Sequence, residues 1–262
     1  MDAQTDTLRS TCPVCNRTAA PITSICIFGE ARPLHQCQFC DAAFYPEPNW
    51  LEQAYSKAIS SMDTGIAERC LDLANVLTAF LWGHRSDTFL DFGGGIGLLS
   101  RIMRDRGFDF HTSDPMAEYR LPQPDCTADV PAMVSLIEVL EHLVDPLAEL
   151  RVILEQAPTV FISTHLIPSD GLTPDWYYLQ PETGQHIFFC STTTLEQIAS
   201  DLKVSVTSNG HNLHVLHRNP LTRWQRLVIR NQQFAWVFGH LGTMFARRRS
   251  LTIVDAESSQ SA

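Results

Sequence analysis

The 262-residue sequence is short of positive charge, because 19 Lys and Arg side chains stand against 29 Asp and Glu, for a net charge of −10. Broad nucleic-acid surfaces need clustered Lys and Arg, which release the counterions condensed on phosphates. A general nucleic-acid binder is therefore not expected. One segment departs from this balance: from Arg218 to Val254 the chain has seven arginines and no acidic residue.

Two further features are missing. No uncharged run approaches the length of a bilayer-spanning helix. The opening residues MDAQTDTLRS are polar and acidic and lack the charged-then-apolar pattern of a signal peptide. We therefore expect a cytoplasmic location. Hydrophobic residues make up 44% of the chain and charged residues 18%, which is enough for one full core and a small additional unit.

Eight cysteines are expected to be reduced in that compartment, so their spacing is more informative than their number. Cys12 and Cys15 form one C-x-x-C pair, and Cys37 and Cys40 form another after twenty-one intervening residues. A redox dithiol needs a single pair, whereas a four-thiolate zinc site needs both. Four thiolates leave zinc no open position, so the metal is expected to be structural. We predict a zinc ribbon over residues 1–46.

Strand-like and helix-like patterns alternate in the following residues, 47–219. The apolar patterns predict strands at 88–92, 109–113, 132–138 and 159–165 and helices at 96–106, 145–156 and 194–202. This alternation predicts a Rossmann-like, doubly wound and mostly parallel sheet, covered by helices on both faces. Alternating residues around Asn209-Gly210, within 203–217, predict a terminal antiparallel hairpin. The fold class is therefore α/β with a small N-terminal zinc ribbon.

The C-terminal part has a different composition. In residues 220–250, Arg223, Arg226 and Arg230 recur at helical intervals beside apolar side chains, which predicts a basic amphipathic helix region. Such a helix can contact an anionic membrane surface, here the inner face of the membrane, or pack on its own domain or a second copy of the chain. Packing is the more common use. The polar residues 251–262 are expected to be disordered.

The sequence FLDFGGGIG begins in the predicted strand 88–92 and continues into a run of glycines. A predicted helix follows at once. A Walker loop would need a Gly-Lys-Ser/Thr ending, and a dinucleotide site would need G-x-G-x-x-G; neither pattern is present. The residues that are present read Asp91-x-Gly93-x-Gly95-x-Gly97. Bare glycine backbone lets a ligand approach closely. A carboxylate ahead of it can receive a cationic amino group and would repel a pyrophosphate.

Asp114 ends the second strand, twenty-one residues after Gly93. Its carboxylate can accept hydrogen bonds from both ribose hydroxyls of an adenosine, although an ordinary Asp-Pro turn is the alternative. An amino acid bound on one side and a ribose on the other describe S-adenosylmethionine.

With FLDFGGGIG, HTSDP and SLIEVLEHLVDP in this order, residues 66–217 resemble the class I S-adenosylmethionine-dependent methyltransferases. The resemblance implies a cofactor site formed by Asp91, Gly93, Gly95, Gly97, Asp114 and Glu138. One departure concerns the third strand, which in the family usually carries an acidic residue near the adenine. Only LPQPDCTADVP stands in its place, so Asp125 and Asp129 are the candidates.

Methyl transfer from a sulfonium is an in-line displacement, and a base is needed only when the acceptor must lose a proton. His186 is the first candidate base, because imidazole titrates near neutrality and the aromatic connection 168–189 suggests a lid over the acceptor. A structural hydrogen bond is the alternative for His186. His142, after the fourth strand, is the second candidate, with support of the cofactor pocket as its alternative role.

The cysteine pairs and the segment WYYLQPETGQH, residues 176–186, are similar to bacterial methyltransferases that modify sugars and surface glycans. This resemblance implies O- or C-methylation of a sugar, nucleotide sugar or glycan intermediate. An RNA methyltransferase is one alternative, but the ribbon lacks a basic surface. A protein that binds the cofactor without turnover is another, and the intact glycine turn argues against it.

Overall fold

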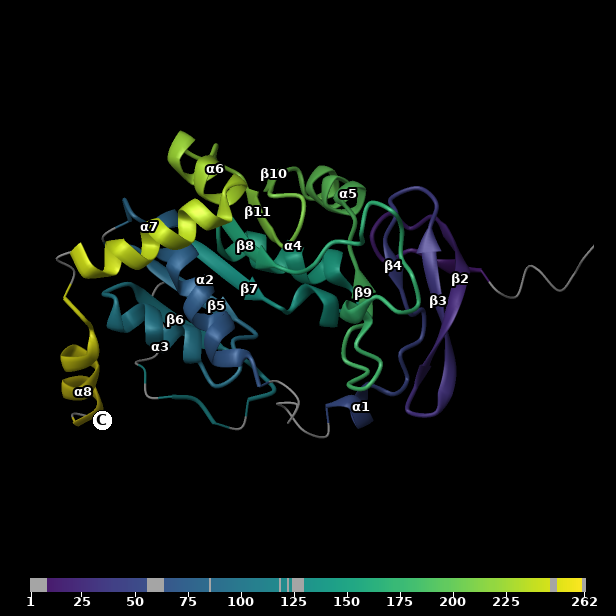
Figure 1. Ribbon diagram of the computed structural model, residues 1–262, viewed down its shortest axis with the longest axis horizontal. Coiled ribbons are helices and arrows are strands. Elements are labelled where there is room, and N and C mark those ends of the chain that lie inside the picture. The colour runs from purple at the N-terminus through teal and green to yellow at the C-terminus, as the bar shows by residue number, and fades with distance from the viewer. Residues whose placement is uncertain are drawn as a thin grey trace, which may run out of the picture.

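The computed structural model describes residues 9–55, 64–84, 86–117, 119–121, 123, 130–245 and 249–260. Two sheets lie next to each other along the long axis of the molecule (Figure 1). The helix-covered sheet occupies the middle, with the C-terminal helix α8 (Thr252–Gln260) at one end. The N-terminal sheet, drawn in purple, forms the opposite end.

The central sheet has the strand order β10-β11-β8-β7-β5-β6. Its strands are β5 (Thr88–Phe92), β6 (Asp109–Ser113), β7 (Met133–Ile137), β8 (Thr159–Ser163), β10 (Ser205–Ser208) and β11 (Leu213–His217). The pairs β6–β5, β5–β7 and β7–β8 are parallel, whereas β8–β11 and β11–β10 are antiparallel. The predicted α/β class, with a mostly parallel sheet and a terminal hairpin, is confirmed. No strand among the described residues lies beyond β6, and Asp125 and Asp129 fall outside them.

Helices cover both faces of this sheet, and a separate apolar cluster fills each side. Leu150, Ile153 and Leu195 belong to the cluster on the side of α4 and α5, and Leu77 and Met103 to the one on the side of α2 and α3. The helices are α2 (Ile66–Phe80), α3 (Leu98–Asp105), α4 (Pro146–Gln156) and α5 (Thr192–Leu202), preceded by the short α1 (Leu51–Ala54). The doubly wound arrangement is therefore complete.

The N-terminal sheet is not confined to residues 1–46. It contains β1 (Ser10–Thr11), β2 (Thr18–Ile27), β3 (Glu30–Cys37), β4 (Ala43–Phe44) and β9 (Phe188–Phe189), all antiparallel. In its last pair, Ala43 lies opposite Phe189. The predicted ribbon thus shares its sheet with a strand from the domain that follows it. The reason is that β4 would otherwise leave an unpaired apolar edge.

The basic C-terminal region forms two helices, α6 (Arg223–Arg230) and α7 (Gln232–Phe245). Trp224 Nε1 donates to Ala79 O at 2.7 Å, and Trp82 stacks edge-to-face with Phe238. Both helices therefore pack on their own domain through α2 and the turn after it. Membrane contact and a homodimer stay predictions. No described helix combines the length and the apolar composition needed to cross a bilayer.

The prediction of a disordered tail over 251–262 is wrong for most of its length, because residues 252–260 form α8. Asp255 is the reason: its carboxylate accepts hydrogen bonds from Arg104 Nε at 2.9 Å and from Arg101 Nη1 at 2.7 Å. These two arginines belong to α3, so α8 is attached to the domain by charge-assisted hydrogen bonds.

Gly239 in α7 lies directly against the backbone of Asn75 in α2, where a Cβ would overlap the Asn75 carbonyl group. Ala is the better helix former, so Gly→Ala within a helix normally stabilises by about 0.5–1 kcal/mol. We expect Gly239→Ala to lower the free energy of unfolding instead, by about 1–3 kcal/mol, since α7 must move away from α2. Gln233→Ala, on the exposed side of α7, is the control. If thermal unfolding shows Gly239→Ala to be more stable than Gln233→Ala, this packing of α7 on α2 is contradicted.

Candidate functional site

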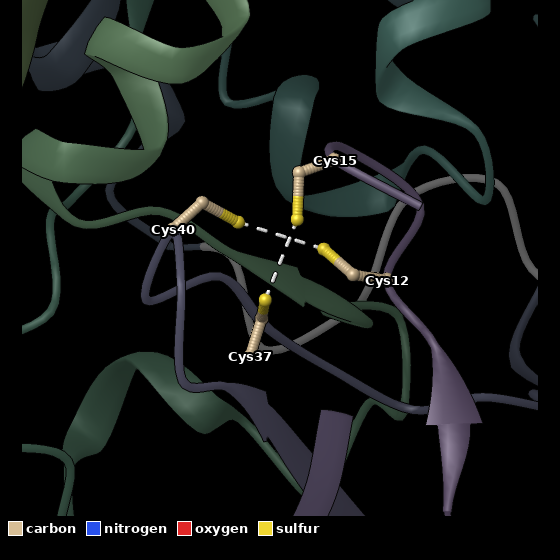
Figure 2. Close-up of side chains that lie close together, drawn as sticks. All are labelled: Cys12, Cys15, Cys37 and Cys40. Atoms are coloured by element: carbon tan, nitrogen blue, oxygen red, sulfur yellow. Dashed lines mark hydrogen bonds between the residues drawn. The ribbon is translucent and has the colours of Figure 1, made fainter. Parts of the chain in front are cut away.

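The four predicted zinc ligands lie together, with their sulfurs pointing at one another (Figure 2). Cys12 Sγ is 3.5 Å from Cys40 Sγ, and Cys15 Sγ is 3.5 Å from Cys37 Sγ. Four sulfurs around a tetrahedral zinc ion with bonds of about 2.3 Å would be separated by roughly 3.8 Å. The centre therefore has the composition and spacing to hold a structural zinc ion with no open position.

Backbone turns place these sulfurs. Asn16 and Asp41, one residue after each C-x-x-C pair, have the positive φ angles 56° and 58°. Their amides donate to Cys12 O and Cys37 O, both at 3.0 Å. The centre is also tied to the other domain, because Thr194 Oγ1 in α5 donates to Cys40 O at 2.7 Å. A metal here would therefore hold the N-terminal sheet against the central domain.

The glycine turn after β5 is built for close approach. Gly93, Gly95 and Gly97 all have positive φ, at 71°, 56° and 81°. A Cβ at Gly93 would lie 2.7 Å from Val139 Cγ2, so this glycine is required for contact with the end of β7. A Cβ at Gly95 would meet nothing within 4 Å. Gly95 therefore presents bare backbone to open space, where a ligand can lie.

Asp114 connects this turn to the end of β6. Its Oδ2 accepts a hydrogen bond from Gly95 N at 2.8 Å, and its Oδ1 accepts one from Met116 N at 2.8 Å. Two predicted cofactor residues from different strands are thus in direct contact. The half-buried carboxylate lies beside the open space at Gly95, as a ligand for the ribose hydroxyls of S-adenosylmethionine should.

Asp91 lies beneath the glycine turn. Its side chain is 1% exposed, and Ser135 Oγ donates to its Oδ1 at 2.7 Å. Its other oxygen lies against Gly94, where any Cβ would overlap it. Burial raises the pKa of Asp91 to about 7, and the Ser135 hydrogen bond opposes that rise. Asp91 therefore supports the turn from below, and its predicted contact with the amino group stays a prediction.

A buried acidic group follows β7. The Tyr178 hydroxyl, in the 3-10 helix η3 (Tyr177–Leu179), lies 2.6 Å from Glu141 Oε1 and 2.9 Å from Glu138 Oε2. Because the hydroxyl has one hydrogen, the second contact needs a proton on one of the carboxyls. Burial and the neighbouring Glu141 accordingly raise the pKa of Glu138 to about 7. Ser163 Oγ also donates to Glu138 Oε1, at 2.6 Å.

The two candidate bases lie together in the same interior. The ring centroids of His142 and His186 are 5.0 Å apart, in an edge-to-face arrangement. His186 Nδ1 donates to Tyr178 O at 2.7 Å, and His142 Nδ1 is 2.8 Å from the Tyr55 hydroxyl. Burial lowers the pKa of His142 to about 4 and that of His186 to about 3. Both rings are therefore neutral at pH 7.

His186 is buried, whereas a lid over the acceptor was expected for residues 168–189. Its side chain is 4% exposed, and Tyr178, Phe188 and Phe189 around it are buried as well. The end of the segment is packed because β9 pairs with β4, whereas residues 169–171 and 173–175 are exposed. Only Tyr177 among these aromatic side chains is mostly exposed, at 64%.

A comparison with protein families assigns residues 63–208 to a methyltransferase domain. This match covers more than half of the chain. The chain belongs to this methyltransferase family. A search of curated proteins gives no match.

Several solved structures are similar to the methyltransferase. They include TnmH, at 18% identity and a TM-score of 0.46, over 65% of this chain and 61% of TnmH. The mitomycin 7-O-methyltransferase MmcR has 15% identity and a TM-score of 0.48, over 65% and 60% of the two chains. The magnesium protoporphyrin IX methyltransferase of Synechocystis PCC 6803, with bound SAH, has 15% identity and a TM-score of 0.42, over 64% and 91%. Likeness at this level carries no information on the acceptor.

The enzyme class predicted from the sequence, a methyltransferase, is confirmed by the family assignment. S-adenosylmethionine remains the cofactor that the sequence predicts. The individual cofactor contacts and the catalytic histidines stay predictions. Sequence reasoning missed Tyr178, which joins Glu138 and Glu141 and accepts the hydrogen bond of His186. Its place in the aromatic segment 176–186 was the available signal, but the connection 168–189 was interpreted as a lid over the acceptor.

Proposed function

We propose that this methyltransferase transfers a methyl group from S-adenosylmethionine to a hydroxyl or an acidified carbon of a sugar, a nucleotide sugar or a glycan intermediate. The observation that carries the proposal is that donor and acceptor residues share one edge of the sheet. The glycine turn and Asp114 follow β5 and β6, and Glu138 follows the neighbouring β7. Open α/β sheets bind their ligands at this edge.

The donor side uses residues that need little movement. Gly95 offers bare backbone, Asp114 accepts hydrogen bonds from the ribose, and Asp91 holds the turn from below. S-adenosylmethionine supplies an electrophilic methyl group on a positively charged sulfur. The carboxylates of Asp114 and Glu138 favour that positive charge and suit a cationic ligand.

The acceptor side is rich in hydrogen-bond acceptors. Glu138 can accept hydrogen bonds from the hydroxyls of a small polyhydroxylated molecule, and the exposed Tyr177 ring can stack on a sugar face. His142 and His186 lie beside these groups and promote the loss of the acceptor proton. RNA fits this side poorly, because its phosphates would meet Asp114, Glu138 and Glu141.

The proposal is tested with purified enzyme, S-adenosylmethionine carrying a labelled methyl group, and a panel of nucleotide sugars, glycolipid intermediates and RNA. Label transfer to a sugar-containing acceptor is expected. His142→Gln removes one imidazole of the acceptor side and should lower kcat by about 10²–10⁴, with the Kd for S-adenosylmethionine unchanged. Methylation of RNA alone, or of nothing while the cofactor binds, would reject this function.

A further inference from the structure

Three side chains of the acceptor side form a cluster of metal-binding groups. Glu141, His142 and His186 each offer one ligand atom, and these atoms lie within 4.8 Å of one another. Glu141 and His142 belong to the 3-10 helix η2 (Leu140–His142) after β7, whereas His186 precedes β9. A backbone hydrogen bond from Ile187 N to Glu141 O, 2.8 Å long, holds the two segments together.

One atom of this cluster lacks a partner. Glu141 is fully buried, and its Oε1 lies within hydrogen-bond distance of Tyr178. Among the described residues, its Oε2 has no hydrogen-bond partner. Burying a carboxylate oxygen in this way is costly unless another group compensates for the lost hydration. A cation between Glu141 and the two imidazoles would do so.

Both imidazoles are restrained at one ring nitrogen by a polar partner. A ligating histidine commonly engages its second ring nitrogen with a carbonyl or another polar group, which fixes the ring and its tautomer. Here Nδ1 of His186 donates to Tyr178 O, so its Nε2 carries the lone pair. The Tyr55 hydroxyl lies 2.8 Å from Nδ1 of His142 and restrains the orientation of that ring.

We infer that Glu141, His142 and His186 form a second metal centre, separate from the four cysteines. Two imidazoles and one carboxylate suit a divalent transition metal of the zinc and iron(II) class. Mg²⁺ and Ca²⁺ are disfavoured, because they prefer ligand sets made of oxygen. With three protein ligands, the ion keeps at least one position for water or for an oxygen of a substrate.

The existence of this centre does not depend on the proposed function. Its role in methyl transfer does rest on that function. The open position would bind the acceptor hydroxyl next to Glu138, and a bound divalent ion strongly favours the deprotonated oxygen. The hydroxyl proton leaves to solvent, and the oxygen then forms its bond to the methyl carbon as the carbon–sulfur bond breaks. The metal does not change its oxidation state.

Cobalt titration of the zinc-loaded, full-length protein tests this centre without cofactor or acceptor. Zinc occupies the cysteine site first, and Co²⁺ is then added. We expect one further equivalent to bind, with visible absorption typical of nitrogen and oxygen ligands and without thiolate-to-cobalt charge transfer. Metal analysis of the protein as purified distinguishes zinc from iron.

Glu141→Gln keeps the shape of the side chain and removes its charge. We expect this variant and His186→Gln to weaken cobalt binding more than about 100-fold, because loss of even an outer partner costs about 10–100-fold. Glu138 contacts the same Tyr178 hydroxyl but is not one of the three proposed ligands. The variant Glu138→Gln should therefore bind cobalt as the wild type does. Circular dichroism reports folding, and Glu141→Gln decides the matter if His186→Gln does not fold.

Cobalt bound only through thiolates, or bound equally well by Glu141→Gln, would overturn the second centre. Because binding is measured without turnover, its failure is separable from failure of the proposed function. Cobalt binding with no methyl transfer to any acceptor would keep the centre and reject the function. Methyl transfer to a sugar-containing acceptor without a second metal equivalent would keep the function and reject the centre.

Discussion

Asp114→Ala is expected to weaken binding of S-adenosylmethionine by about 1.5–3 kcal/mol, roughly 10- to 150-fold in Kd, from the loss of charged hydrogen bonds. Two effects act in the same direction. The variant removes the carboxylate that would receive the ribose hydroxyls. It also removes the acceptor for Gly95 N, whose 2.8 Å hydrogen bond holds the glycine turn to the end of β6. The 2.8 Å hydrogen bond from Met116 N, which shapes the local turn after β6, is lost as well.

Isothermal titration calorimetry measures this loss directly. Asp170→Ala removes the same group from an exposed loop position and should leave Kd unchanged. Asp114→Asn keeps one carbonyl oxygen as an acceptor and should give a smaller loss. A folded Asp114→Ala protein that binds S-adenosylmethionine with the affinity of the wild type would place the ribose elsewhere.

Cys37→Ser is expected to have the largest effect on stability. Cys37 is fully buried, and its Sγ lies 3.5 Å from Cys15 Sγ. Structural zinc contributes about 10–16 kcal/mol of apparent binding energy in small zinc domains. We therefore expect loss of zinc and a fall of more than about 4 kcal/mol in the free energy of unfolding. Zinc content and thermal unfolding measure the two changes.

Activity should fall together with zinc content. The cysteine centre is joined to the central domain by Thr194 and by pairing of Ala43 with Phe189, three residues after His186. Cys26→Ser makes the same chemical change at an exposed cysteine outside the cluster and should leave zinc and stability unchanged. A Cys37→Ser protein with full zinc content and wild-type stability would contradict a four-thiolate centre.

Local patterns predicted the central domain well. The strand 88–92 was predicted at its observed bounds, and the helix predicted over 145–156 is α4, which Asp145 caps with Pro146 at its first turn. These features depend on neighbours within a few residues. The tail was mispredicted for the opposite reason, since α8 is held by Arg101 and Arg104 of α3, about 150 residues earlier. A polar composition alone does not reveal such a partner.

The glycine turn and the cysteine cluster were also predictable as local features, because each lies on short motifs. The Asp-x-Gly-x-Gly-x-Gly turn needs a positive φ at every second residue, Gly93, Gly95 and Gly97, and only glycine adopts a positive φ at little cost. The pairs Cys12–Cys15 and Cys37–Cys40 carry their own turn geometry, and the structure brings all four sulfurs together.

By itself, the sequence determined the order of the strands and motifs along the chain, the glycine turn and the two cysteine pairs. These features depend on local spacing and on residue chemistry. Tertiary structure alone decided that β9 joins the N-terminal sheet and that His186 meets Glu141 and His142. These residues lie 44 and 45 positions apart in the chain. Only pairing between distant segments, such as β4 with β9, brings them into contact, and no local pattern encodes that pairing.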